Sequence, residues 1–263
     1  MAFEPIEAEL LYPLALEDSA RNYFICYTIN NGQPYKGAWQ YTVDGVPVVG
    51  VFLRKTGIVQ IAVKPGFDLR PIKIDLETLL SEMPWKQANL SLSQARFIRE
   101  MPFNMVEKEG AFIAACTPSD YKPSGYAGAL EIKALDVAHI DEIIALYQMV
   151  FHGFASRSYM IEKLIGGRGR AVGGFLDGKL IAVAQTDYES ETSAIIVGVA
   201  THPSYQGKGY GRVCFESLST DLINEGKTLY LQYDSKIAGA LYESVGFKVV
   251  EEIVHIENQS FIL

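Results

Sequence analysis

The second half of the chain alternates between the hydrophobic patterns of strands and of helices. Apolar residues three or four positions apart predict helices within 136–151, 158–165, 209–225 and 236–245. Alternating apolar and polar positions predict strands over 130–134, 170–176, 179–186, 192–201, 228–233 and 247–256. In chain order this is a strand, two helices, a three-stranded meander, and then helix, strand, helix and strand. We expect an α+β or α/β domain with a mixed, mainly antiparallel sheet flanked by helices.

The first half repeats this pattern in a weaker form. Asp44 with Gly45, and Asp177 with Gly178, each separate two apolar runs, and an Asp-Gly pair in that setting predicts a β-hairpin. Three further segments match in character, namely 58–65 with 195–203, 90–93 with 229–232, and 101–103 with 245–247. The spacing between matching segments grows along the chain, as small insertions at turns would produce. We interpret the first half as a degenerate copy of the second; an unrelated α+β domain with a hairpin is the alternative.

Residues 117–125 break the hydrophobic pattern between the two halves. Two prolines, a glycine and short polar side chains make this stretch typical of a linker. We therefore expect a degenerate N-terminal domain over 1–116, a linker over 117–126 and a second domain over 127–263. A chain of 263 residues is long enough for two such domains.

A glycine-rich stretch at 206–212 carries the clearest chemical signal. It follows the apolar run 194–200 and precedes the helical segment 213–222, so it joins a strand to a helix N-terminus. Glycines let the backbone approach a ligand closely, and the first N–H groups of a helix have no partner inside it. With the helix dipole, these groups form a site for a phosphate or diphosphate. The glycine spacing fits neither a Walker-type phosphate loop nor a dinucleotide fingerprint.

Within this stretch, Gln206, Gly209 and Gly211 form a Gln-x-x-Gly-x-Gly pattern, which resembles the acetyl-CoA loop of the GNAT superfamily of N-acetyltransferases. Two flanking segments resemble the same family. They are 199–203, a strand end followed by proline, and 240–247, in which Tyr242 precedes a Gly-Phe pair. The resemblance covers roughly residues 127–257. It implies two tandem GNAT-like domains, of which only the C-terminal one has a complete acetyl-CoA site.

The resemblance implies two groups of acetyl-CoA contacts. Backbone groups at a strand bulge would pair with the pantetheine arm, at Val199, Ala200 and Thr201. Gly198 fits such a bulge, although close packing against a helix would also require glycine. The loop would bind the diphosphate through Gln206, Gly207, Lys208, Gly209, Tyr210, Gly211 and Arg212. Lys208 could equally be a solvated surface lysine. Ser235 stands where many relatives carry asparagine, either as its substitute or as a helix cap.

Direct transfer of the acetyl group to an amine is the chemistry that the resemblance implies, with Tyr242 as the general acid for the CoA sulfur. A phenol has an ordinary pKa near ~10, so it stays protonated at neutral pH. The alternative role of Tyr242 is that of a core tyrosine. The position at which some relatives hold a glutamate base falls near Ile195, which cannot accept a proton. The base remains open between water and the side chains of Asp187, Glu189, Glu191, His152 and His202. The three carboxylates lie on the turn before that strand, where we expect a charged, solvated hairpin tip.

The first half lacks the residues of this site. One glycine, Gly66, survives in the matching stretch 66–72. Asp68 would place a negative charge where a phosphate should bind, and Pro71 removes a backbone donor. We therefore expect no CoA binding by the first half.

Composition narrows the function further. A net charge of −8 argues against a nucleic-acid partner and mildly favours cationic substrates. The three cysteines are widely spaced, which suggests reduced thiols in a cytoplasmic protein. The sequence has neither the pattern of a signal peptide nor a stretch apolar enough for a membrane span. It also has no Cys/His cluster with metal-ligand spacing and no Gly-x-Ser-x-Gly hydrolase motif.

We therefore expect an acetyl-CoA-dependent N-acetyltransferase that acts on a small amine by direct transfer in a ternary complex, without a metal. A non-catalytic CoA-binding sensor or regulatory module is the alternative, and transfer of a longer acyl chain is a third possibility. The chain would be a monomer whose two halves form a pseudo-dimer, or a homodimer. The sequence carries no signature of the acceptor amine.

Overall fold

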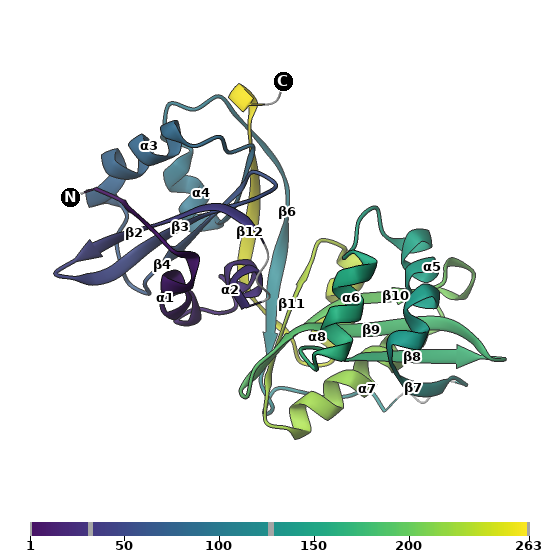
Figure 1. The fold of residues 1–263 in the computed structure, drawn as a ribbon. Helices are drawn as coiled ribbons and strands as arrows, with labels where there is room; N and C mark the ends of the chain where they lie inside the picture. The colour runs from purple at the N-terminus through teal and green to yellow at the C-terminus, as the bar shows by residue number, and fades with distance from the viewer. Residues whose placement is uncertain (1, 31–33, 126–128, 262–263) are drawn as a thin grey trace. The chain divides into compact units, whose positions relative to one another are not determined.

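The computed structural model describes residues 2–30, 34–125 and 129–261, which form two compact units (Figure 1). Unit 1 comprises Met1–Ile113 together with Val250–Leu263, and unit 2 comprises Ala114–Val249. Each unit is a sheet covered by helices. The expected α+β class and tandem organisation are thereby confirmed.

Unit 1 has a mainly antiparallel sheet with the strand order β1-β2-β3-β4-β5-β12. Its first five strands are β1 (Glu4–Ile6), β2 (Tyr35–Val43), β3 (Val46–Arg54), β4 (Ile58–Val63) and β5 (Gln87–Ser91). The helices are α1 (Tyr12–Leu16), α2 (Tyr23–Asn30), α3 (Lys73–Glu82) and α4 (Leu92–Ile98). Apolar residues of α1 and α2 fill the core on one face of the sheet, and those of α3 and α4 fill it on the other. The parallel pairing of β4 with β5 follows from the crossover through α3.

Unit 2 repeats this plan with the strand order β11-β10-β9-β8-β7. The strands are β7 (Glu131–Leu135), β8 (Ala171–Leu176), β9 (Lys179–Glu189), β10 (Ser193–Thr201) and β11 (Thr228–Tyr233). The helices are α5 (Ile140–Val150), α6 (Arg157–Ile165), α7 (Tyr210–Asn224) and α8 (Lys236–Ser244). One core cluster joins α5 and α6 to the sheet, and another joins α7 and α8. The predicted helices and strands are all present, with shifts of a few residues at their ends.

The two Asp-Gly pairs form the predicted hairpins. Asp44 and Gly45 join β2 to β3 with φ values of 50° and 77°, and Asp177 and Gly178 join β8 to β9 with 50° and 74°. Two successive residues with positive φ make the turn that matches the right-handed twist of paired strands. This local geometry is therefore the same in both units.

The end of the chain belongs to unit 1, whereas the sequence placed all of 127–263 in one domain. β12 (Lys248–Asn258) pairs antiparallel with β5, from Ile253 opposite Ser91 to Glu257 opposite Gln87. Figure 1 shows this strand in yellow beside the blue elements of unit 1. The division of the structure thus falls at residue 249 rather than at the end of the chain. A pairing between strands so distant in sequence cannot be predicted from a local sequence pattern.

Residues 117–125 of the expected linker pack against other elements of unit 2, whereas residue 126 lies outside the described residues. The Tyr121 hydroxyl donates to the backbone oxygen of Glu216 on α7, and the Ser124 N–H and hydroxyl donate to the Glu216 carboxylate. The Lys122 N–H donates to the carbonyl oxygen of Val245, which follows α8. These bonds satisfy backbone groups that a solvated linker would offer to water. The prolines and polar residues here therefore belong to an ordered segment.

No helix within the described ranges is long and apolar enough to cross a membrane. The same residues contain no group of three His, Cys, Asp or Glu side chains placed to hold a metal ion.

Candidate functional site

The glycine-rich stretch forms a tight loop at the N-terminus of α7. Gly207 and Gly209 have φ values of 76° and 77°, a region that side chains with a Cβ rarely adopt. Gly209 is the N-cap of α7, and the N–H of Val213 makes the first helical bond to its carbonyl oxygen at 3.1 Å. The N–H groups between these residues therefore lie in the first turn of the helix without a partner inside it. N–H groups in this position at a helix N-terminus are the arrangement on which the predicted anion site depends.

Thr201, at the end of β10, anchors this loop. The Gln206 side-chain amide donates to the Thr201 carbonyl oxygen at 3.2 Å, so Gln206 orients the loop. A Cβ on Gly211 would lie 2.6 Å from the Thr201 hydroxyl oxygen, so glycine allows α7 to start close against the strand. The structure thus brings the predicted strand and loop residues together.

The open edge of β10 begins beside this loop. β10 pairs in parallel with β11 only from Ser193 to Ile196. Gly198 has a φ of 59°, and the pairing of β10 with β9 shifts register between Val197 and Ala200. The predicted bulge is therefore confirmed. Close packing, the alternative reason for a glycine, also applies, because a Cβ on Gly198 would clash with the Tyr147 hydroxyl on α5.

The two cations of the loop have local partners. The Lys208 ammonium nitrogen lies 5.4 Å from the ring centre of Tyr205. Arg212 donates to the Ser244 hydroxyl at 2.9 Å and to the Glu216 carboxylate at 3.3 Å, which joins α7 to the end of α8. The Glu216 carboxylate offsets part of the Arg212 charge at the first turn of α7.

Tyr242 lies on α8 in the apolar core and is 7% exposed. Its ring packs 5.0 Å from Phe215, 5.6 Å from Tyr233 and 6.0 Å from Phe247, between ring centres. Burial, and then the neighbouring Tyr233, raises the pKa of Tyr242 to about 12. Its hydroxyl makes no hydrogen bond within the described part of the chain. Tyr242 is thus a core tyrosine whose phenol keeps its hydrogen-bond donor.

Ser235 takes the N-cap position of α8, with φ −80° and ψ 126°. Its side chain makes no capping hydrogen bond, although serine caps commonly accept one. The capping role considered for Ser235 is therefore not seen in this conformation.

Asp187 lies within β9, whereas the sequence suggested a solvated hairpin tip. Its carboxylate accepts hydrogen bonds from the Tyr159 hydroxyl at 3.2 Å and from the Lys163 ammonium at 3.4 Å. Burial raises the pKa of Asp187, and Lys163 opposes that shift. The pKa of Lys163 is lowered in turn, because its ammonium group is taken out of water.

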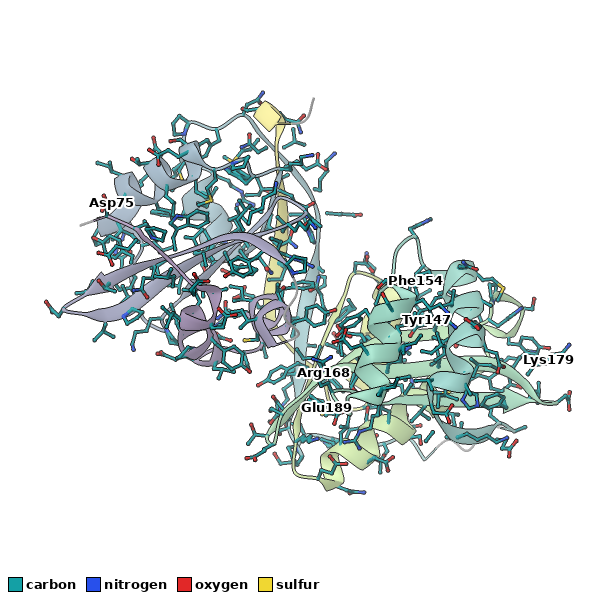
Figure 2. The ribbon with its side chains drawn as sticks, viewed as in Figure 1. Asp75, Tyr147, Phe154, Arg168, Lys179 and Glu189 are labelled. Atoms are coloured by element: carbon teal, nitrogen blue, oxygen red, sulfur yellow. The ribbon has the colours of Figure 1, made fainter. Side chains whose placement is uncertain are left out.

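Glu189, which is labelled in Figure 2, is also paired. Its carboxylate lies 2.6 Å from Arg170 and 2.9 Å from Lys227, and it accepts a hydrogen bond from the Thr186 hydroxyl at 2.6 Å. Burial alone would raise the pKa of Glu189, but hydrogen bonds from Arg170, Thr186 and Lys227 lower it overall. A carboxylate stabilised in this way is a weak base.

The remaining base candidates lie nearer the surface. Glu191 and His152 are exposed. His202 is half-buried, where its ring accepts a hydrogen bond from the Ser204 N–H at 3.2 Å. It also packs against the Tyr205 ring.

A buried polar chain beside the bulge escaped the sequence analysis. The Tyr147 hydroxyl donates to the Gly198 carbonyl oxygen at 2.8 Å, and the Gln185 amide donates to the Tyr147 oxygen at 2.8 Å. The Lys163 ammonium donates to the Gln185 amide oxygen at 2.7 Å. Lys163 is 1% exposed, three residues after the buried Met160. In the sequence, the only sign of this buried polar chain is a lysine on the apolar face of a predicted helix.

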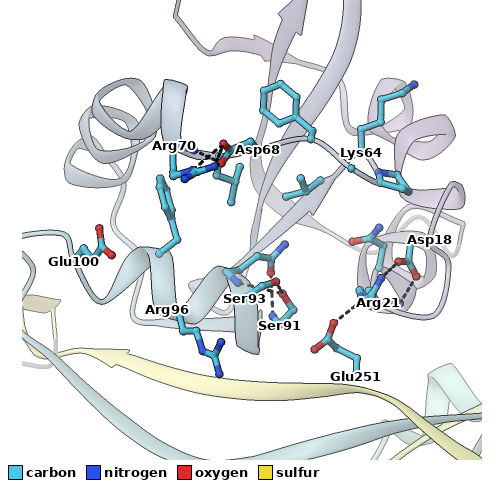
Figure 3. Close-up of a pocket in the computed structure, with 18 residues that line it drawn as sticks. Asp18, Arg21, Lys64, Asp68, Arg70, Ser91, Ser93, Arg96, Glu100 and Glu251 are labelled. Atoms are coloured by element: carbon cyan, nitrogen blue, oxygen red, sulfur yellow. Dashed lines mark hydrogen bonds and ion pairs between the residues drawn. The ribbon is translucent and has the colours of Figure 1, made fainter.

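Unit 1 has a cavity of about 540 Å³ at the loop that follows β4 (Figure 3). Within this loop, Asp68 accepts hydrogen bonds from the Arg70 backbone N–H at 3.0 Å and from its guanidinium at 2.8 Å. β4 and β5 pair only at Ile58 and Val59, and the Gln94 amide then donates to the Ile61 carbonyl oxygen at 2.8 Å. In unit 1, the side chains of Asp68 and Gln94 thus occupy a backbone N–H of the loop and a carbonyl oxygen of β4. The corresponding loop and strand edge of unit 2 keep such groups unpaired within the described ranges.

Comparisons with known proteins agree with this geometry. Residues 140–247 match the profile described as "Acetyltransferase (GNAT) family", and no curated protein matches the chain. An acetyltransferase from the GNAT family of Colwellia psychrerythraea aligns with a TM-score of 0.69 and 15% identity, over 98% of this chain and 100% of that one. A GCN5-related N-acetyltransferase from Kribbella flavida gives 0.64 and 16%, over 91% and 95%. A tandem GNAT protein from the clavulanic acid biosynthesis pathway gives 0.67 and 12%, over 97% and 98%.

The solved structures share the fold over nearly the whole chain, and the profile covers the loop, the open strand edge and Tyr242. Residues 140–247 of the chain therefore match the GNAT family of acetyltransferases, and nearly the whole chain has the fold of solved GNAT structures, a tandem one among them.

Proposed function

We propose that unit 2 transfers an acetyl group from acetyl-CoA to the amino group of a small molecule, by direct attack in a ternary complex. The observation that carries this proposal is the loop with Gly207 and Gly209 at positive φ, placed at the start of α7 beside the open edge of β10. Backbone N–H groups of the loop would bind the diphosphate. The pantetheine amides would pair with Val199 and Ala200 like an added strand.

The proposed reaction forms one bond and breaks one. The amine nitrogen attacks the thioester carbonyl carbon, the new C–N bond forms and the C–S bond breaks. The CoA sulfur takes a proton while the nitrogen loses one, so that the products are an amide and free CoA. Tyr242 would donate its proton to the departing sulfur, since its raised pKa keeps the phenol protonated, and the phenolate would then recover a proton from water. A backbone N–H near Val199 would bind the developing negative charge on the carbonyl oxygen.

The proton lost by the amine goes to water in this proposal. Asp187 is held by Lys163 and Tyr159, and Glu189 is stabilised as an anion by Arg170 and Lys227. Neither carboxylate is free to accept a proton without losing partners. Water needs no such rearrangement.

Aromatic side chains near the bulge favour an amine with an apolar body. The rings of Phe151 and Phe154 pack 5.1 Å and 5.5 Å from Tyr147, and Phe154 is 39% exposed (Figure 2). Aromatic faces attract both apolar groups and cations. The net charge of −8 would draw a protonated amine toward the protein before it loses its proton.

A non-catalytic CoA sensor is the second candidate. It is favoured by the pairing of the Asp187 and Glu189 carboxylates and by the core position of Tyr242. Purified protein mixed with acetyl-CoA and an amine library separates the two candidates. Amine-dependent release of free thiol supports the enzyme. Binding of CoA by calorimetry without thiol release from any amine supports the sensor, and absence of CoA binding contradicts both.

A further inference from the structure

Two irregularities in the β9–β10 pairing compensate each other. Ile195 pairs with Tyr188 but Ile196 with Thr186, so Asp187 is an extra residue on β9. Val197 pairs with Gln185 but Ala200 with Val183, so β10 has the extra residue at Gly198 and Val199. The register slips by one residue and then returns. Such paired bulges re-aim a short stretch of backbone while the rest of the sheet is kept.

The buried polar chain connects these two bulges. Lys163 lies 3.4 Å from Asp187 at the first bulge, and the Tyr147 hydroxyl bonds to Gly198 at the second. Gln185 joins the two ends through its amide. All the links are short except the Lys163–Asp187 contact, and Tyr147, Gln185 and Lys163 are at most 4% exposed.

A polar chain of this kind is a poor source of stability. Apolar side chains of similar volume would fill the same space without the cost of removing an ammonium group from water. A fully bonded buried network instead specifies one geometry, because any displacement leaves a polar group without a partner. What the chain specifies here is the direction of the Gly198 carbonyl.

That direction also sets the direction of the next N–H. The Gly198 carbonyl and the Val199 N–H belong to one trans peptide plane and point in opposite directions. Because Tyr147 holds the carbonyl toward α5, the Val199 N–H points away from α5. In the proposed function, that N–H polarises the thioester carbonyl.

We propose that Tyr147 is a positioning residue, which aims the Val199 N–H at the thioester carbonyl oxygen and is itself held by Gln185 and Lys163. The inference rests on the proposed acetyl transfer for its catalytic consequence. The orientation of the peptide is a property of the free protein and is testable without any substrate.

Tyr147→Phe tests the proposal. The ring keeps its packing against Phe151 and Phe154, and only the hydroxyl is lost. Removal of a whole oxyanion donor costs ~10²–10³ in kcat, so a misdirected one should cost ~10–100-fold. The Kd for acetyl-CoA should change less than about threefold, because the diphosphate contacts lie on the loop. In the double variant Tyr147→Phe with Gln185→Met, kcat should fall little further, since Tyr147→Phe has already interrupted the buried polar chain.

Tyr121→Phe is the matched control. It removes a hydroxyl that bonds to Glu216 and Thr220 on α7, with no bond to the bulge. The control should keep kcat within about twofold of the wild type, even where it lowers the melting temperature as much as Tyr147→Phe. Equal losses of kcat in the two variants would mean a merely structural role and would overturn the proposal.

A second measurement separates this proposal from the proposed function. The backbone ¹⁵N resonance of Val199 in the ligand-free protein should shift in Tyr147→Phe, and its amide should exchange faster, whereas Tyr121→Phe leaves both unchanged. An unaltered Val199 signal in Tyr147→Phe overturns the positioning role. A wild-type protein that acetylates no amine contradicts the proposed function, while the Val199 signal still decides whether Tyr147 holds the peptide.

Discussion

Gly211 is the second residue of α7, and its missing side chain decides how closely the helix approaches β10. A Cβ at this position would lie 2.6 Å from the Thr201 hydroxyl oxygen, whereas the next atom, the Thr201 Cβ, would be 3.9 Å away. The steric conflict in Gly211→Ala is therefore with one oxygen atom. Thr201→Ala removes that oxygen, and Thr201→Val replaces it with a methyl group of similar size.

The effect of Gly211→Ala on the free energy of unfolding is the sum of two opposing effects. Overpacking a close contact costs ~1–3 kcal/mol. Alanine in place of glycine within a helix returns up to ~1 kcal/mol. A double-mutant cycle of Gly211→Ala with Thr201→Ala cancels the second effect, because it is present in both backgrounds. We expect a coupling energy of ~1–3 kcal/mol in the free energy of unfolding.

Acetyl-CoA binding should follow the same pattern. Gly211→Ala moves the first turn of α7 away from Thr201, and with it the N–H groups proposed to bind the diphosphate. A loss of ~1–3 kcal/mol corresponds to a Kd about 5- to 150-fold higher. Thr201→Ala in the same chain should bring the Kd back to within about threefold of the wild type.

Denaturant unfolding measures the coupling and titration calorimetry measures the Kd. Thr201→Val combined with Gly211→Ala is the control that should restore neither quantity. A coupling energy below about 0.5 kcal/mol, which is the scatter expected for independent sites, would exclude a steric conflict between Gly211→Ala and Thr201. Restoration of binding by the valine variant as well as by the alanine variant would exclude it too.

Three further predictions concern other parts of the chain. Tyr242→Phe should lower the turnover of acetyl-CoA at least ~10²-fold with little change in its Kd, in a thiol-release assay; equal rates would remove the acid role. Calorimetry should give one acetyl-CoA per chain, because Asp68 takes the Arg70 N–H in unit 1, and two sites in the wild type would contradict this account. Glu225 has its pKa lowered to about 2, first by Arg170 and then by Lys227, so its stabilising effect is present above pH 4.5 and is lost as the pH falls toward 2. Glu225→Gln should therefore be less stable than the wild type at neutral pH, by at most ~1 kcal/mol for so exposed a carboxylate, and the difference should vanish by about pH 2; a gap that widens in acid would exclude this pairing.

Features fixed by neighbouring residues could be predicted from the sequence. The hairpins at Asp44 and Asp177 and the loop around Gly209 require positive φ at particular positions. Glycine and aspartate adopt positive φ more readily than most residues, so their presence there predicts these turns. The order of strands and helices in unit 2 also follows from local periodicity. The bulge at Gly198 was predictable for the same reason.

Features that depend on distant pairing could not be predicted in this way. β12 joins β5 across more than 150 residues, from Glu257 to Gln87, and its alternating pattern fits either unit equally well. The side chain of Asp187 was expected in solvent, but its position at a bulge places it against Lys163. A helix pattern shows which face is buried but not which polar group it will meet.

The sequence by itself therefore determined the glycine-rich loop, the hairpins and the resemblance to the GNAT family, because each depends on residues within one or two turns of the chain. Only the tertiary structure decided that Tyr147, Gln185 and Lys163 form one buried chain that ends on Gly198. Four elements, α5, α6, β9 and β10, must pack before those groups meet. The energy that fixes the bulge comes from these long-range contacts, and no local pattern encodes them.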